Sequence, residues 1–259
     1  MNFFYCFQSE WIKRKRSLAS WLVILGGIFI PAIIFIEQIV KGEKLIEELK
    51  SPLFWKNIFG ECWEPTALFI LPMGIILSTS LIAQLEYKNN SWKQVHTTPQ
   101  KMSTIFLAKY TVVLVMMVQF FILFNIGILM VGIVPSIIYK NLPFPSEPIP
   151  FIYFIKTNIG FFITCLPIIA LQYLLSIKYK NFFVSIGFGL LLLVASLFAL
   201  SVKYGFIMPY SYSLFYFMKI FKNAHQIPEG INIHWLAIIY FVVFSTAGFI
   251  FYVTKKEKG

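Results

Sequence analysis

The sequence predicts an all-α integral membrane protein with six transmembrane helices and both termini on the cytoplasmic side. The prediction rests on composition, on the spacing of long apolar stretches and on the distribution of basic residues. The 259 residues are 58% hydrophobic and 19% aromatic, and only 13% of them are charged. A soluble domain carries roughly 25% charged residues. This composition excludes a soluble enzyme, a disordered chain and a secreted disulfide scaffold.

Six apolar stretches are long enough to cross a membrane, because a helix needs about 20 residues to span the ~30 Å hydrocarbon core. They are residues 18–36, 66–85, 105–134, 151–176, 182–202 and 235–253. The third stretch is longer than a span requires, which predicts that it tilts or projects from the bilayer. The first stretch follows a basic cluster, but no A-x-A-like site comes after it, so an uncleaved anchor is expected rather than a signal peptide.

Basic residues predict the orientation of the spans. With the N-terminus inside, 13 of the 22 Lys and Arg residues and three of the 11 glutamates lie on the inner side. The inner side then has a net charge of +10 and the outer side +1. By the positive-inside rule, both termini are therefore expected in the cytoplasm. Because the loops account for the basic excess, no nucleic-acid partner is expected.

The N-terminal residues 2–12 are rich in aromatic side chains and lead into a basic cluster. A helix here would lie in the inner membrane interface, with Phe4, Phe7 and Trp11 on one face. A plain flank of the first span explains the same residues equally well. Lys13 and Arg16 are expected to contact lipid phosphates. The residues expected to anchor this segment at the interface are Trp11, Lys13, Arg14, Lys15 and Arg16.

Two segments between spans are expected on the outer side. Residues 37–64 contain six glutamates and are expected to form a loop. An amphipathic surface helix is expected in it from the apolar positions Ile39, Leu45, Ile46 and Leu49. Residues 206–221 are apolar, but they are short for a span and a proline interrupts them. A seventh span there would move the basic C-terminal tail outside. An outer re-entrant or interfacial hairpin between the last two spans is therefore expected.

Motifs for catalysis are missing from the sequence. There is no G-x-x-x-x-G-K-[ST] phosphate loop, so the chain is not expected to hydrolyse ATP itself. H-E-x-x-H and G-x-S-x-G are also absent. The three cysteines are far apart and lack the CxxC spacing of a metal or redox site. No catalytic residue, bound metal or cofactor is therefore expected in this chain.

The interiors of the spans are almost free of charged residues, which disfavours proton-driven transport. The polar residues that remain are neutral: Ser78, Thr79, Ser80, Gln84, Gln119, Asn125, Asn158, Thr164 and Gln172. Hydrogen bonding between helices is the favoured explanation for them. The alternative is a substrate path, for which the candidates are Ser78, Gln84, Gln119 and Asn125.

The loop at residues 86–104 is the largest on the inner side and contains three lysines and one glutamate. Asn89, Asn90 and Ser91 can cap a helix that begins near Trp92, and Pro99 would end this helix within about two turns. A short helix would then lie across the cytoplasmic face with an aromatic anchor. On its residues alone, it fits a lipid-facing turn and a docking element for a partner protein equally well.

This loop resembles the coupling-helix region of ABC-2 type transporter permeases, where E-x-x-N-x-[ST]-W-K precedes a proline turn and a lysine in the next span. The matching residues are Glu86, Asn89, Ser91, Trp92, Lys93, Thr98, Pro99, Phe106 and Lys109. The N-terminus is similar too, with an acid before K-x-K/R-[RS], and so are the six spans and a Pro-Tyr-Ser-Tyr run at residues 209–212. Within the family the chain is most similar to permeases of lantibiotic and bacitracin self-immunity exporters.

The resemblance implies a single ABC-2 type transmembrane domain over residues 1–259, located in the bacterial cytoplasmic membrane. A separate nucleotide-binding subunit would bind ATP and Mg²⁺, and a second permease chain, identical or homologous, would complete the path. ATP-driven closure of the ATPase pair would switch the permeases between inward and outward states. The implied docking residues on the coupling helix are Glu86, Asn89, Asn90, Trp92, Lys93, Thr98 and Pro99.

The resemblance also implies a substrate class. An exporter of this kind would remove antimicrobial peptides or other amphipathic molecules from the membrane. The alternative is a membrane assembly or sensor protein that docks a cytoplasmic partner and transports nothing.

Overall fold

The computed structural model describes residues 3–15, 17–42, 44–88, 100–139, 141–179, 181–222, 228 and 230–254. Over these ranges the chain is helical and contains no β-strand, which confirms the all-α fold class. Six of the described helices are long and apolar enough to cross a membrane. Their bounds are Leu18–Lys41, Phe54–Leu85, Met102–Ile138, Phe151–Lys178, Phe182–Ala199 and Ile233–Thr254.

The helices follow one another along the chain with short connections. The first half consists of α1 (Phe3–Arg14), α2 (Leu18–Lys41), α3 (Lys44–Lys50), α4 (Phe54–Pro65), the π-helical turn η1 (Thr66–Ile70) and α5 (Leu71–Lys88). The second half consists of α7 (Met102–Ile138), α8 (Phe151–Lys178), α9 (Phe182–Ala199), η2 (Gly205–Ile207), η3 (Pro209–Ser211), α10 (Tyr212–Phe221) and α11 (Ile233–Thr254).

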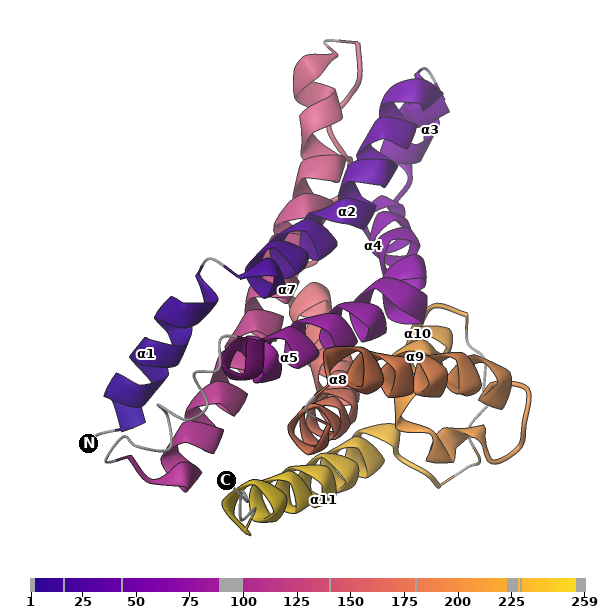
Figure 1. Cartoon of the computed structure of the whole chain (residues 1–259). Helices are drawn as coiled ribbons and strands as arrows, with labels where there is room; N and C mark the ends of the chain where they lie inside the picture. Colours follow the sequence, from indigo (N-terminus) through magenta and orange to yellow (C-terminus); the bar gives the residue numbers. More distant parts are fainter. Residues whose placement is uncertain are drawn as a thin grey trace.

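Helices α5 and α8 lie at the centre of the bundle. Helix α5 packs against α2, α8 and α9, and α8 also packs against α11 (Figure 1). Helix α2 crosses α7 so closely that a Cβ atom on Gly127 would lie 2.7 Å from Pro31 Cβ. Helix α11 is at the rim. In its apolar stretch only 11% of the residues are buried, against 61% in that of α8. Most of its surface is therefore left for lipid or for another chain.

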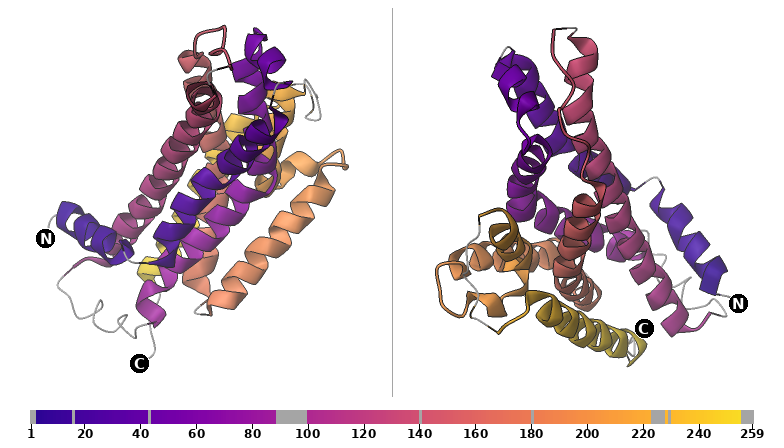
Figure 2. Two further views of the ribbon diagram at one scale, coloured as in Figure 1. Left: turned by 90° about the horizontal axis from the view of Figure 1, so that it is seen from above. Right: turned by 180° about the vertical axis from the view of Figure 1, so that it is seen from behind.

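One end of the bundle brings together segments that the charge rule assigns to the inner side (Figure 2). Cys6 of α1 packs against Ile105 at the start of α7. The Phe106 ring lies 5.6 Å from the Tyr252 ring near the end of α11. Gln84 Nε2 in α5 donates to the carbonyl oxygen of Tyr179, the residue directly after α8. The grouping is the one that an alternating six-span topology requires, and the cytoplasmic location of this end stays a prediction.

The opposite end brings together the connections that are expected outside. The Trp55 indole Nε1 donates to the Glu147 carbonyl oxygen at 3.0 Å, which ties α4 to the segment between α7 and α8. Glu64, near the end of α4, forms an ion pair with Lys222 after α10. These contacts join residues that are 92 and 158 positions apart in the sequence.

Residues 37–64 differ most from the sequence-based prediction. The prediction of a loop is wrong, because α2 continues to Lys41 and α4 continues through η1 into α5, so the second apolar helix begins at Phe54 instead of residue 66. The expected surface helix exists only over Lys44–Lys50, and it turns Leu45 and Leu49 into the bundle. Charged residues in α4 lower its hydropathy, whereas its aromatic face is stabilised by packing against the other helices.

Smaller differences affect the other spans. The third span extends to Met102–Ile138, the fourth to Lys178, and the sixth covers Ile233–Thr254. The fifth ends at Ala199 instead of residue 202, because the chain turns sharply there. In this turn a Cβ atom on Gly205 would lie 1.8 Å from the Ala199 carbonyl oxygen, so only glycine fits.

The segment between α9 and α11 folds back onto the bundle. Its short helices η2, η3 and α10 bury Tyr210, Tyr212 and Phe217, and the Ser213 hydroxyl donates to the Ala67 carbonyl oxygen at 3.0 Å. The segment is thus packed against η1 and α8. Its re-entry into the membrane stays a prediction.

Candidate functional site

The predicted docking loop lies mostly outside the described residues. This applies to Asn89, Asn90, Trp92, Lys93, Thr98 and Pro99. Glu86 belongs to the last turn of α5, and its side chain is not among the described ones. The structure does describe the two helices that the loop connects, α5 and α7, and the start of α7 lies beside α1. The roles of the docking residues therefore stay predictions.

Arg14 connects α1 to α7. Its side chain is only 6% exposed, and its Nη1 donates to Gln119 Oε1 at 2.9 Å. The guanidinium carbon also lies 3.6 Å above the Trp11 ring, a cation–π contact. Burial lowers the pKa of the Arg14 guanidinium from its ordinary value. Arg14 therefore holds α1 on the bundle.

The other predicted anchor residues have different positions. Lys13 Nζ pairs with Glu10 at 2.6 Å within α1, and Lys15 is exposed. Arg16 is outside the described residues. The Trp11 ring stacks on Phe7 at 5.8 Å, and Phe7 stacks on Phe3. The aromatic row of α1 thus continues to Phe3, while Phe4 is exposed.

All four candidate path residues are hydrogen-bonded within the bundle. The Ser78 hydroxyl donates to the Gly74 carbonyl oxygen of its own helix at 2.6 Å. Gln84 Nε2 donates to the Tyr179 carbonyl oxygen at 3.2 Å, and the Gln119 oxygen accepts from Arg14. The bonds of Gln84 and Gln119 connect different helices, as the favoured explanation predicts, whereas the Ser78 bond stays within α5. A role of these residues in transport stays a prediction.

The fourth candidate, Asn125, lines a groove between α7 and α8. The groove has a volume of about 630 Å³. It is lined by Val118, Phe121, Ile122, Asn125, Ile126, Leu129, Phe151, Phe154, Ile155, Asn158, Ile159 and Phe162. Ten of these twelve side chains are apolar, and the two polar ones are asparagines. Because α7 and α8 are both long enough to span the membrane, the groove between them is expected to face lipid or a neighbouring chain.

The two asparagines form a reciprocal amide pair. Asn125 Nδ2 donates to Asn158 Oδ1 at 3.0 Å, and Asn158 Nδ2 donates to Asn125 Oδ1 at 2.8 Å. Each Nδ2 also donates to a carbonyl oxygen four residues earlier, at 2.7 Å. Each amide oxygen has a second lone pair that can accept a bond from a ligand. By its sequence, Asn158 is one of the neutral polar residues but not one of the path candidates, because no local pattern shows that it pairs with Asn125.

A second polar cluster lies at the centre of the bundle and joins α5, α8, α9 and η3. Gln172 Nε2 donates to Ser80 Oγ at 2.9 Å and to the Ser185 carbonyl oxygen at 3.0 Å. The Tyr210 hydroxyl donates to Gln172 Oε1 at 3.0 Å. Ser176 and Ser185 hydroxyls lie 2.7 Å apart, and all five residues are buried. The sequence singled out Ser80 and Gln172 but missed the other three.

Replacing Gln172 with leucine is expected to lower the free energy of unfolding by about 1–3 kcal/mol. The change removes the acceptor of the buried Tyr210 hydroxyl. It also removes the donor to the Ser80 hydroxyl and to the Ser185 carbonyl oxygen, while the serine hydroxyls still contact one another. Unfolding of the purified chain in mixed micelles with increasing SDS measures the loss. The matched control is Ser78→Ala, which removes only a bond within one helix and should change little. Equal stability of the two variants would contradict a structural role for the cluster.

Together these features define a multi-pass membrane protein with a central cluster and a groove whose polar side chains are neutral and bonded to one another. A family profile described as "ABC-2 family transporter protein" matches residues 6–196, from α1 into α9. The chain belongs to this family. No curated protein and no solved structure gives a significant match. The chain is thus a transmembrane component of an ABC transporter, and the family implies an ABC ATP-binding partner.

Proposed function

We propose that this chain is the permease subunit of an ATP-driven exporter that removes amphipathic molecules, antimicrobial peptides among them, from the membrane. The groove between α7 and α8 is the observation that supports this substrate class best. Its apolar walls suit an acyl chain or an apolar peptide face, and the Asn125–Asn158 pair offers neutral acceptors for polar groups. A fixed charge for an ionic substrate is absent from this lining.

The proposal includes a division of labour between subunits. A separate nucleotide-binding subunit binds ATP and Mg²⁺ and docks on the loop between α5 and α7, with Trp92 and Pro99 as central residues. A second permease chain, identical or homologous, packs beside this one in the bacterial cytoplasmic membrane, with both termini inside. The exposed surface of α11 is available for such a contact. ATP-driven closure then moves the coupling helices and changes the access of the substrate site.

Purification of the chain from its native membrane in a gentle detergent tests this function. An ABC ATPase should co-purify, and its hydrolysis should rise when amphipathic peptides are added. The alternative function is a membrane assembly or sensor protein. It predicts a bound partner but no movement of peptide across vesicles that contain the purified complex. Absence of any ATPase in the purified material would contradict both the docking loop and the exporter.

Replacing Asn125 with leucine is expected to reduce substrate-stimulated ATP hydrolysis about 3- to 10-fold, the value of one lost hydrogen bond. Asn158→Leu should have the same effect, and the double variant little more, because the two amides act as one unit. ATPase assays in nanodiscs over a range of peptide concentrations measure the change. The control is Thr246→Val on α11, whose hydroxyl bonds to its own helix. Unchanged stimulation in both asparagine variants would exclude the groove as the substrate site.

A further inference from the structure

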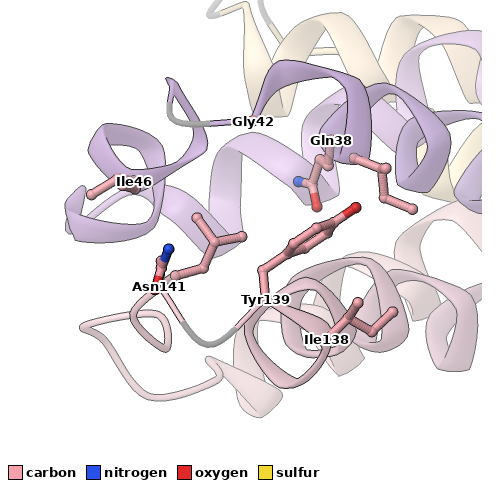
Figure 3. A pocket seen from close by; sticks show the side chains of 8 residues that line it. Gln38, Gly42, Ile46, Ile138, Tyr139 and Asn141 are labelled. Carbon is pink, nitrogen blue, oxygen red and sulfur yellow. The ribbon is translucent and has the colours of Figure 1, made fainter.

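A separate pocket lies where the end of α2, the start of α3 and the end of α7 meet (Figure 3). Its volume is about 390 Å³, and it shares no residue with the groove between α7 and α8. Gly42, with φ of 56°, lets the chain turn from α2 into α3. The residues that line the pocket are Gln38, Ile39, Gly42, Ile46, Ile138, Tyr139, Asn141 and Leu142.

Gln38 is a buried polar residue that the packing of the bundle does not explain. Its side chain is 2% exposed, and its Oε1 atom has no hydrogen-bond partner. Figure 3 shows this amide directed into the pocket, toward the ring of Tyr139. A buried amide oxygen without a partner is costly, and a leucine would fill the same space without that cost. The Gln38 amide oxygen is therefore expected to accept a hydrogen bond from a molecule that enters the pocket.

The pocket also limits what this molecule can be. Among the described residues, its lining is apolar apart from Gln38, Tyr139 and Asn141, so the ligand needs an apolar body. An unpaired carbonyl oxygen requires a donor, which means an N–H or O–H group. The nearby cation, Lys41, is held by Glu48 at 3.1 Å and by Glu37 at 3.4 Å. Because Lys41 is paired in this way, it gives an anionic head group no advantage.

We propose that this pocket binds a single-chain amphiphile, taken from the adjacent membrane leaflet, that donates an N–H or O–H hydrogen bond to Gln38 Oε1. Its apolar chain lies against Ile39, Ile46 and Leu142. The site is independent of the substrate groove. The proposal for this pocket can therefore be confirmed or contradicted independently of the exporter function.

Cysteine labelling at the rim of the pocket tests the proposal. Asn141 is exposed on the rim, and the three native cysteines are all buried, so Asn141→Cys introduces one accessible thiol. The chain is placed in phosphatidylcholine nanodiscs, and the rate of reaction with a maleimide is measured with added n-dodecylamine, n-dodecanol or dodecyltrimethylammonium. The first two should slow labelling at lower concentrations. The third has the same chain but no N–H donor and should protect about 3- to 10-fold less well.

A variant pair links this protection to Gln38. In the Asn141→Cys background, Gln38→Leu should abolish the difference between dodecylamine and dodecyltrimethylammonium. Gln84→Leu removes a glutamine that is already bonded at the other end of the bundle and should leave the difference intact. Phe144→Cys, exposed on the same connection but outside the pocket lining, reports on unspecific effects of the amphiphiles. Equal protection by both amphiphiles, or a difference that survives Gln38→Leu, would overturn the proposal.

Discussion

Replacing Trp63 with alanine is expected to lower the free energy of unfolding by about 3–5 kcal/mol, the usual cost of removing a large aromatic ring from a packed core. Trp63 is fully buried. Its ring stacks on Phe161 of α8 at 3.6 Å with an interplanar angle of 5°, and it meets the Phe124 ring of α7 at 4.8 Å. The substitution would therefore leave a cavity where α4, α7 and α8 meet.

The free energy of unfolding is measured by adding SDS to the protein in mixed micelles. Loss of helix is monitored by circular dichroism, so the signal does not depend on tryptophan fluorescence. Two controls separate ring packing from other effects. Trp63→Phe should cost less than about 1.5 kcal/mol, because the Trp63 Nε1 has no partner in the described structure and its loss breaks no bond. Trp21→Ala, at a side chain that is 60% exposed, should have little effect on stability. If Trp63→Ala were as stable as Trp21→Ala, the packing described here would be wrong.

Replacing Trp92 with alanine is expected to reduce the amount of ATPase recovered with the chain by at least about tenfold, with normal membrane insertion. The expectation rests on the proposed docking role of the loop between α5 and α7. An aromatic anchor at the centre of a protein interface is worth about 2 kcal/mol or more, which corresponds to roughly a 30-fold change in affinity. Pro99→Gly should act in the same direction, because it removes the residue expected to end the coupling helix.

Quantitative co-purification from membranes that express both subunits measures this effect. Trp21→Ala is the matched control, since it removes an exposed tryptophan that belongs to α2 and not to the loop. Expression and detergent extraction of each variant show whether the bundle itself is intact. Full recovery of the ATPase with Trp92→Ala would place its docking surface elsewhere on the cytoplasmic side.

Several features of the fold could be predicted because a local property determines them. Hydropathy alone located the helices around residues 105–134 and 151–176 to within a few positions, since a long apolar run in lipid can satisfy its backbone only as a helix. The resemblance of residues 86–109 to a coupling-helix region led to the family that the profile over residues 6–196 shows. The subgroup, the substrate and the docking residues stay proposals.

Other features depend on contacts between distant residues. Helix α4 contains Glu61 and Glu64, which made it look like a loop, yet Phe59 and Trp63 fix it in the bundle. Arg14, an expected interface anchor, is buried and donates to Gln119, 105 positions away. Tyr210, Ser176 and Ser185 show no local sign that they would meet around Gln172.

The sequence by itself determined that this protein is a helical membrane protein of the ABC-2 type, because span length, apolarity and a short motif are local properties of the chain. Only the tertiary structure decided which polar groups meet. It paired Asn125 with Asn158, assembled the cluster around Gln172 and left the Gln38 oxygen without a partner. Such groups are placed by the packing of helices that are distant in sequence, and each hydrogen bond depends on the relative position of two of them.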